Sequence, residues 1–298
     1  MRFIHRSLFQ TLLGASLWGL SGNAAQVLFH DYNFPVNGLV ATRMLISGTI
    51  LMLILRPRIP PKPWGRLIVL AVIGYAGSQF FYLLAIQFSN AATATLLQFL
   101  FLPMVASYEG ITGLFHWSKQ WTLTMILAVV GTVLLVVGES FKVLITPSGI
   151  AAGLLAAFSG AYYTLGSKAY VRQRGSWWIT GYGFTLGGLA TLPFGILSLW
   201  NYQFPNTLTE SLRLGLLLVF VIVFGTLLAF GLYVSGLERL TATETGVASS
   251  LEPIVSALAA YAFLGVLLSP AQYFGGALII LAVVIVAVRA GKAVGIQP

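Results

Sequence analysis

The sequence contains no cysteine among its 298 residues. Disulfide bonds and thiolate metal sites are therefore excluded, and His5, His30 and His116 lie too far apart to suggest a histidine metal site. Charge is also scarce: Asp, Glu, Lys and Arg make up 8% of the chain, against about 25% in a typical soluble protein. Hydrophobic residues make up 58%, and the mean hydropathy is +0.90. These values predict an integral membrane protein, and we expect it to bind neither a metal nor a cofactor.

Ten apolar runs divide the chain, and each is long enough to supply the roughly 20 helical residues that cross a bilayer. We place them at residues 8–28, 37–55, 67–87, 91–113, 120–138, 149–167, 177–199, 212–236, 242–266 and 271–289. Arg2 and Arg6 before the first run would also suit a signal peptide, but the length of that run favours a membrane helix. The predicted fold class is an all-α integral membrane protein with ten transmembrane helices.

Basic residues are distributed unevenly between the two sides of this arrangement. If the N-terminus is cytoplasmic, all of the 16 Lys and Arg residues except Arg43, Lys142 and Arg213 fall in cytoplasmic segments. Basic loops are retained in the cytoplasm during insertion, so both termini should be cytoplasmic. The net charge of +9 is then a topology signal. We therefore expect a multi-pass protein of the cell membrane that contacts the lipid bilayer and no nucleic acid.

The two halves of the chain contain similar sequence segments in the same order. Residues 89–103 (SNAATATLLQFLFLP) align with residues 239–253 (RLTATETGVASSLEP) at an offset of 150, which brings Pro103 onto Pro253. Five helices in each half is an odd number, so the second half must cross the membrane in the opposite sense to the first. We predict two inverted five-helix repeats, at residues 8–138 and 149–290, with a substrate site between them near the bilayer midplane.

Each half resembles the EamA-type repeat of the drug/metabolite transporter superfamily. In the first half the resemblance is carried by GASLWG, Arg43 and NAATATLL, and in the second by ERLTATETGVASSLEPIVSALAAYAFLG, SPAQ and GGALIILAVV. The segment GLFHWSKQW departs from the pattern, because the family often has a Gly-Glu turn there. The resemblance implies a transporter, since members of the family export amino acids, nucleotide-related metabolites, sugars or drugs.

Polar side chains at helical spacing distinguish helices that line a cavity from helices that only pack. In the ninth run Ser249, Glu252 and Ser256 continue a polar stripe that begins at Thr245. We expect further cavity residues in the other runs: Trp18, Asn23, Arg43, Tyr75, Gln79, Tyr82, Gln98, Ser159, Tyr162, Tyr163, Thr226 and Tyr233. The alternative for each is an interhelical hydrogen bond, worth about 0.6 kcal/mol in a membrane. The fifth and tenth runs have almost no polar stripe and should be peripheral.

Two ionisable residues lie well inside predicted membrane helices. An acid at that depth costs roughly 2.5–3.5 kcal/mol on insertion scales, so Glu252 should face other helices or water rather than lipid. It is either a structural hydrogen-bonding group, a proton-coupling group or a ligand for an amine on the cargo. Arg43 can extend toward the membrane surface, pair with an acid or bind an anionic group of the cargo. Glu109 and Glu244 lie near span ends, where an interfacial position or a role in gating is expected.

The predicted function is a secondary transporter that exports small metabolites, most of all amino acids or related compounds. A cavity rich in Tyr, Trp and amide groups would suit a lipophilic drug almost as well, so a multidrug or cationic compound exporter is the first alternative. A channel-like or structural membrane subunit is the second. The sequence has no phosphate-binding Gly-rich loop, HExxH or GxSxG motif, so we do not expect an enzyme. We expect a monomer or a homodimer.

Overall fold

The computed structural model describes residues 2–57, 64–89, 91–114, 118–137, 146–264 and 269–293, and the regular structure in these ranges is helical. Arg58, Lys62, His116 and Lys142 lie outside them. The described helices group into ten columns: α1 (Arg2–His30); α2 (Val36–Leu55); α3 (Gly65–Val69), η1 (Leu70–Ala76) and α4 (Gly77–Phe88); α5 (Ala91–Gln98) and α6 (Phe101–Ile111); α7 (Lys119–Val137); α8 (Pro147–Arg174); α9 (Ser176–Trp200); α10 (Leu208–Val219), η2 (Phe220–Leu228) and α11 (Ala229–Gly236); α12 (Ala242–Ser249) and α13 (Leu251–Leu264); and α14 (Pro270–Ala293).

These columns match the ten predicted runs and differ from them mainly at the ends. Among the described residues, six columns are long and apolar enough to cross a membrane, and α7 and α14 contain shorter apolar stretches. The first helix starts at Arg2 and the sixth column continues to Arg174, several residues beyond the predicted ends. Helical hydrogen bonding continues past the apolar part of each of these two helices.

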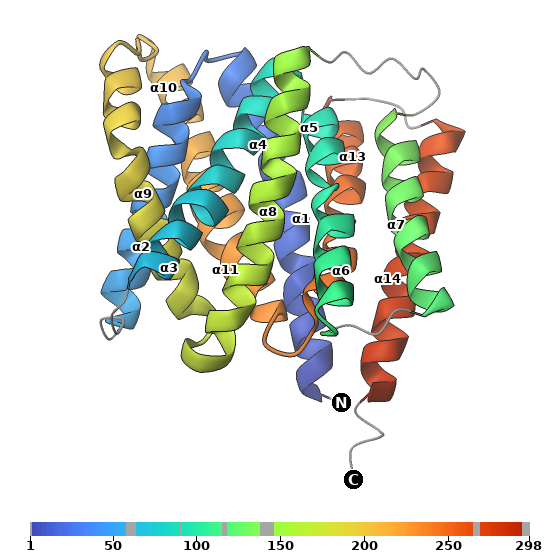
Figure 1. Ribbon diagram of the computed structural model, residues 1–298. Coiled ribbons are helices and arrows are strands. Elements are labelled where there is room, and N and C mark those ends of the chain that lie inside the picture. The colour runs from blue at the N-terminus through green and yellow to red at the C-terminus, as the bar shows by residue number, and fades with distance from the viewer. Residues whose placement is uncertain are drawn as a thin grey trace.

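The contacts between columns are related by exchange of the two halves of the chain. Helix α1 packs on α11 as α8 packs on α4, and α1 packs on α13 as α8 packs on α5 and α6. The pairs α2–α9 and α7–α14 each join equivalent columns. Figure 1 shows α1 starting at the face where α14 ends, and α8 starting at the opposite face. The two halves are therefore inverted, as the odd number of helices per repeat predicts.

Two irregularities recur at the offset of 150 residues. The π-helical segments η1 and η2 begin at Leu70 and Phe220, inside equivalent columns. The next column of each half is broken in two, between α5 and α6 and between α12 and α13. Each break comes just before a proline, Pro103 or Pro253, which has no N–H to continue the helical hydrogen bonding. The predicted equivalence of these prolines is confirmed by the breaks.

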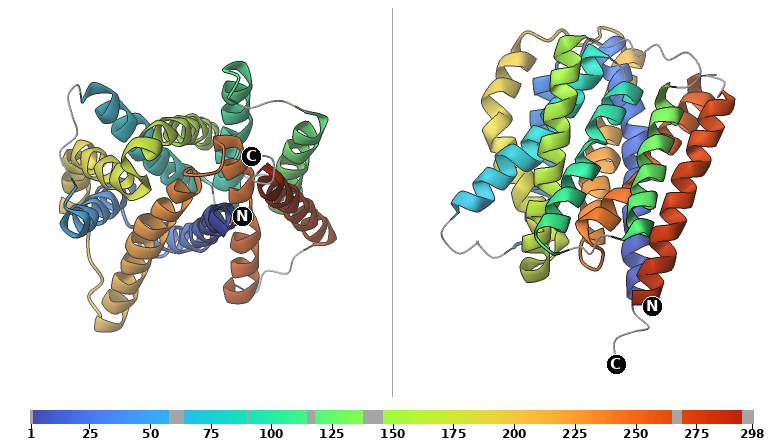
Figure 2. Two further views of the ribbon diagram at one scale, coloured as in Figure 1. Left: turned by 90° about the horizontal axis from the view of Figure 1, so that it is seen from below. Right: turned by 45° about the vertical axis from the view of Figure 1, so that its right-hand side comes forward.

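Helices α7 and α14 lie side by side at one edge of the bundle, which both views of Figure 2 show. Gly131 of α7 allows this close approach: a Cβ atom there would lie 2.7 Å from the backbone oxygen of Gly275 in α14. Small residues at such contacts let membrane helices pack backbone to backbone. The prediction that the fifth and tenth membrane helices are peripheral is therefore confirmed.

Candidate functional site

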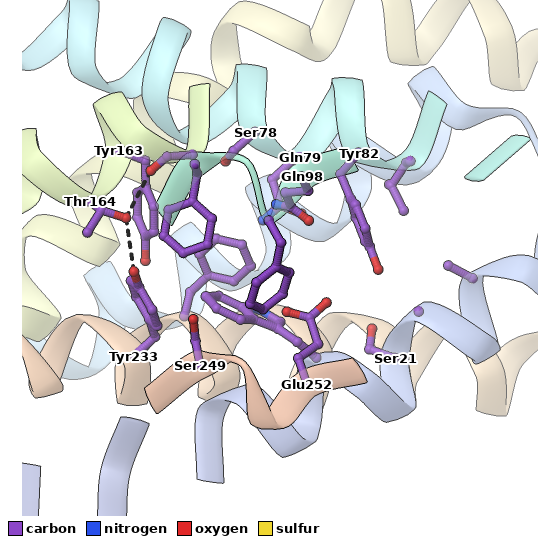
Figure 3. Close-up of a pocket in the computed structure, with 18 of the residues that line it drawn as sticks. Ser21, Ser78, Gln79, Tyr82, Gln98, Tyr163, Thr164, Tyr233, Ser249 and Glu252 are labelled. Carbon is purple, nitrogen blue, oxygen red and sulfur yellow. Dashed lines mark hydrogen bonds between the residues drawn. The ribbon is translucent and has the colours of Figure 1, made fainter. Parts of the chain in front are cut away.

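A cavity lies in the middle of the bundle, between helices of both halves. Figure 3 shows side chains from several columns converging on it. Its lining consists of Trp18, Ser21, Gly22, Ala25, Arg43, Ser78, Gln79, Tyr82, Leu83, Gln98, Phe99, Phe101, Gly160, Tyr163, Thr164, Phe230, Tyr233, Ser249 and Glu252. Within the described residues the lining takes nothing from α7, α9 or α14. Helix α9 does not reach the lining because it packs against α2 and η1.

Nine of the residues that the sequence singles out come together in this lining. They are Trp18, Arg43, Gln79, Tyr82, Gln98, Tyr163, Tyr233, Ser249 and Glu252. The other six, Asn23, Tyr75, Ser159, Tyr162, Thr226 and Ser256, lie elsewhere, and each has a physical reason. Polar side chains inside a membrane bundle often hydrogen-bond between helices, and Asn23, Ser256, Tyr75 and Thr226 do so here.

Asn23 and Ser256 are partners of each other across the contact between α1 and α13. The Asn23 amide donates to the Ser256 carbonyl and to Ser256 Oγ, both at 3.2 Å, and to the carbonyl of Gly19 at 3.1 Å. The two helices touch closely here, because a Cβ atom on Gly19 would lie 2.5 Å from the carbonyl oxygen of Glu252. These polar side chains therefore join helices and do not line the cavity.

Three predicted residues on η1 and α8 point away from the cavity. Tyr75 has no exposed surface, because its hydroxyl accepts from Ser167 Oγ at 3.2 Å and its ring packs on Gly183 of α9. Ser159 fills the contact with α4, where a Cβ atom on Gly77 would lie 2.7 Å from its Oγ. Tyr162 lines a separate hollow with Lys168 and Thr241. Successive residues of a helix point about 100° apart, so Tyr163 faces the main cavity and Tyr162 does not.

Arg43 enters the cavity from α2 and is held from behind by η2. Its Nε donates to Thr226 Oγ1 at 2.7 Å, and that hydroxyl donates to the carbonyl of Val221 at 2.8 Å. Ser47, one turn further along α2, donates to the Ile222 carbonyl at 3.2 Å. Arg43 is only 4% exposed. Thr226 is therefore the support of Arg43 and not part of the lining.

Glu252 enters the cavity from the first turn of α13, and its side chain points inward in Figure 3. It is 6% exposed, and the hydroxyl groups of Tyr82 and Thr95 lie beside its carboxylate. These two hydroxyls also bond each other at 3.1 Å. In the part of the chain that the structure describes, the salt bridge present joins Arg213 to Glu210 at the surface. Arg43 and Glu252 therefore share a cavity without pairing.

One end of the cavity is an aromatic wall. The Trp18 ring lies 4.6 Å from Phe230 and 4.9 Å from Tyr233, and Tyr163 lies 5.5 Å and 5.8 Å from the same two rings. The Tyr233 hydroxyl bonds Thr164 Oγ1 at 3.0 Å. Trp18 Nε1 and the Tyr163 hydroxyl have no hydrogen-bond partner in the described protein. Buried polar atoms are almost always paired, so these two atoms are exceptions within the aromatic wall.

The lining also contains residues that the polar stripes did not reveal. Ser21, Ser78 and Thr164 lie one or two residues from Asn23, Gln79 and Tyr163, which the stripes include, and the stripes passed over them. Phe99, Phe101 and Phe230 are apolar and cannot be told from lipid-facing or core positions by polarity. The break before Pro103 was the available signal for the first two, because an interrupted helix tends to line a cavity in a membrane protein.

An inverted repeat with a polar, charge-bearing cavity at the interface of its halves is the architecture of a secondary transporter. The model of the EamA-like transporter family matches residues 5–137 and, a second time, residues 147–288. Because these matches cover most of the chain, the protein belongs to the EamA-like transporter family. It is a multi-pass membrane transporter of small molecules and not an enzyme.

Relatives agree with this assignment along almost their whole length. The chain is 28% identical over 293 residues to the uncharacterized inner membrane transporter YicL of Salmonella typhimurium (strain LT2), covering 94% of this chain and 95% of YicL. It is 27% identical over 301 residues to the uncharacterized transporter YwfM of Bacillus subtilis (strain 168), covering 96% and 95%. A crystal structure of a protein with 20% identity matches with a TM-score of 0.72, covering 96% of this chain and 97% of the other. At that identity the match establishes the fold alone.

Proposed function

We propose that the protein exports small zwitterionic metabolites, amino acids or related compounds, by alternating access of the cavity to the two sides of the cell membrane. The observation that carries this proposal is that Arg43 and Glu252 lie in one cavity and form no ion pair with each other. An uncompensated charge inside a membrane protein is costly. A cargo with a carboxylate and an ammonium group would compensate both charges at once.

The geometry of the two charged groups supports recognition of such a cargo. Thr226 takes the Nε of Arg43, which leaves the two terminal nitrogens of the guanidinium for a carboxylate. A planar guanidinium binds a carboxylate through two parallel hydrogen bonds. Glu252 stands on the other repeat and would accept from the ammonium group. The aromatic wall, with Trp18 Nε1 and the Tyr163 hydroxyl unpaired, would then receive the remainder of the cargo.

A multidrug or cationic compound exporter is the second candidate, and the aromatic wall beside Glu252 is the observation that favours it. Aromatic rings attract cations through their faces. A lipophilic cation would compensate Glu252, but it would leave the Arg43 guanidinium without a counter-charge. The zwitterion accounts for both charged residues and is therefore the first choice.

The proposed orientation places both termini in the cytoplasm, as the distribution of Lys and Arg predicts. The two repeats, proposed at residues 8–138 and 149–290, would exchange their conformations when the cavity changes sides. Glu252, Arg43 and the seven other predicted lining residues are the proposed site. The monomer or homodimer expected from the sequence stays a prediction.

Counterflow in proteoliposomes tests the proposal. Vesicles loaded with one amino acid from a panel of neutral, aromatic, acidic and basic members should accumulate the same radiolabelled compound, because a carrier exchanges cargo for cargo. The N-acetyl derivative lacks the ammonium group and the methyl ester lacks the carboxylate, so neither should compete. Arg43→Gln should abolish the discrimination against the ester, and Glu252→Gln the discrimination against the N-acetyl compound. Arg213→Gln, at the exposed ion pair, serves as the matched control.

Two outcomes would overturn the zwitterion proposal. Exchange of a cationic dye such as ethidium, with no exchange of any amino acid, would establish the multidrug alternative. Uptake that needs no cargo on the opposite side and shows no counterflow would indicate a channel.

A further inference from the structure

A buried carboxylate outside the cavity joins the two repeats. Glu109 lies near the end of α6 and is 1% exposed. Its Oε1 accepts from the backbone N–H of Ala242 at 3.0 Å. Its Oε2 accepts from the backbone N–H of Thr243 at 2.8 Å and from Thr243 Oγ1 at 2.7 Å. All three donors belong to the first turn of α12, so one side chain of the first repeat caps a helix of the second.

This cap is strong for physical reasons. The first N–H groups of a helix have no partner within the helix, and the helix dipole favours a negative charge there. Hydrogen bonds to an ionised acceptor are also roughly twice as strong as neutral ones. Lys168 of α8 also binds the start of α12, because its Nζ donates to the carbonyl of Leu240 just before that helix.

The position of the cap places it at one end of the cavity. Helix α6 ends toward the face at which α1 begins and α14 ends, here called the termini side (Figure 1). Just inside Glu109, α6 and α12 are in direct contact, because a Cβ atom on Gly246 would lie 2.9 Å from Leu102 Cδ1. Leu102 is next to the lining residue Phe101, and Gly246 lies one turn from the lining residue Ser249, so the contact between α6 and α12 lies between the cavity and the termini side.

The opposite face has a weaker counterpart. Helix α5 corresponds to α12 in the other repeat, and its first N–H, that of Ala91, donates to Gln26 Oε1 at 3.0 Å. This acceptor is a neutral amide, whereas Glu109 offers a carboxylate, and hydrogen bonds to an ionised acceptor are the stronger ones. Among the described residues, α6 also packs on α12 more extensively than α13 packs on α5. The two ends of the cavity are thus equivalent in backbone and unequal in strength.

We infer that Glu109 is the latch of the gate on the termini side. The inference rests on the alternating-access function proposed above: opening toward the termini side requires α6 and α12 to separate, and this breaks all three hydrogen bonds of Glu109. The latch holds the transporter closed on that side when no cargo is bound. Loss of the latch shifts the resting population toward the state that is open to the termini side.

Cysteine accessibility tests the latch without any cargo, so its outcome does not depend on identifying one. The chain has no native cysteine. The reporter is Val105→Cys, at a position that lies one turn before Glu109 on the same face of α6 and is fully buried. Its rate of modification by a maleimide is measured in purified protein, alone and combined with Glu109→Gln or Thr243→Val. Glu109→Gln replaces one carboxylate oxygen by an amide donor and removes the negative charge, and Thr243→Val removes one of the three donors.

We expect Glu109→Gln to speed modification of the reporter about tenfold, with a smaller increase for Thr243→Val. Tenfold corresponds to about 1.4 kcal/mol, near the low end of the range for one hydrogen bond to a charged group. Glu244→Gln is the matched control. Glu244 caps the same helix, but in the part of the chain that the structure describes its carboxylate accepts from the backbone N–H of Thr241, within its own repeat. The control should leave the rate unchanged.

Three results would overturn the latch. The first is an unchanged rate in both Glu109→Gln and Thr243→Val. The second is an equal increase in Glu244→Gln, which would attribute the effect to fraying of α12. The third is an equal increase at a second reporter, Ala41→Cys, at a buried position in the contact between α2 and α9, outside the hydrophobic cluster that contains Leu102 and Val247 at the gate. That result would mean general loosening of the fold.

Discussion

Replacement of Thr226 by valine should weaken cargo binding while the fold stays intact. The Thr226 hydroxyl accepts from Arg43 Nε at 2.7 Å and donates to the Val221 carbonyl at 2.8 Å. Valine keeps the branched shape of threonine and loses the hydroxyl, so the substitution is not neutral at this buried position. Nε then has no acceptor, and the guanidinium regains one only by rotating away from the orientation that Thr226 gives it.

The size of the effect follows from the cost of an unpaired buried donor. This cost is about 1 to 3 kcal/mol, and it is larger for charged groups. When the guanidinium rotates to recover a partner, the cost appears as weaker cargo binding, and that energy corresponds to about 5- to 150-fold. We therefore expect the half-saturating cargo concentration in counterflow to rise about tenfold or more in Thr226→Val. Thr226→Ser keeps the hydroxyl and should behave like the wild type.

A double-mutant cycle separates positioning from packing. In an Arg43→Gln background, Thr226→Val should have no further effect on half-saturation, because the group that Thr226 orients is gone. If Thr226→Val and Thr226→Ser lower the unfolding temperature equally and leave half-saturation unchanged, Thr226 contributes packing alone. Additive effects of Thr226→Val and Arg43→Gln on half-saturation would likewise refute the positioning role.

Three further substitutions test other parts of the structure. Glu252→Gln should raise half-saturation for zwitterions at least tenfold in counterflow, whereas intact exchange with a lost pH dependence would instead make Glu252 a proton-coupling group. Asn23→Leu removes two bonds to Ser256 and should cost about 1 kcal/mol of stability at about 0.6 kcal/mol each, seen as a lower unfolding temperature with unchanged half-saturation. Tyr32 lies outside the spans, and its hydrogen bond to Glu210 raises its pKa. The hydrogen bond between Tyr32 and Glu210 contributes its full stability below about pH 10, and this stability is lost as the pH rises through the raised pKa of Tyr32. The unfolding temperatures of Tyr32→Phe and wild type should therefore differ at pH 8 and converge at strongly alkaline pH.

The number, order and inversion of the helices could be predicted because they depend on quantities that the sequence states directly. A bilayer requires about 20 apolar residues per crossing, and an odd number of crossings per repeat inverts the second repeat. The two prolines at equivalent positions then mark where each half interrupts a helix. Helix ends were less predictable, since α1 and α8 extend beyond their apolar regions and include basic residues such as Arg6 and Arg174.

One error in the predicted cavity lining comes from an irregular helix. Tyr75, Gln79 and Tyr82 have the spacing of one face of a straight α-helix, yet Tyr75 faces α9. Tyr75 lies in η1, and the wider turn of a π-helix rotates it away from the face of the residues in α4. The apolar sequence of η1 contains no feature that predicts this wider turn. On α8 both Tyr162 and Tyr163 are amphipathic, so only the packing of neighbouring helices decides which one enters the cavity.

The repeats are equivalent in backbone and different in charge, and this difference gives the cavity a direction. At the offset of 150 that superimposes the two prolines, Glu252 corresponds to Leu102, which is fully buried. Two acids at these positions would face each other across the pseudo-two-fold axis, repel each other and offer a cargo two equivalent orientations. Among the described lining residues, the acid comes from the second repeat alone and the arginine from the first alone. A zwitterion in the proposed site would therefore bind in one orientation, and exchange of the two gates would move it across the membrane without turning it over.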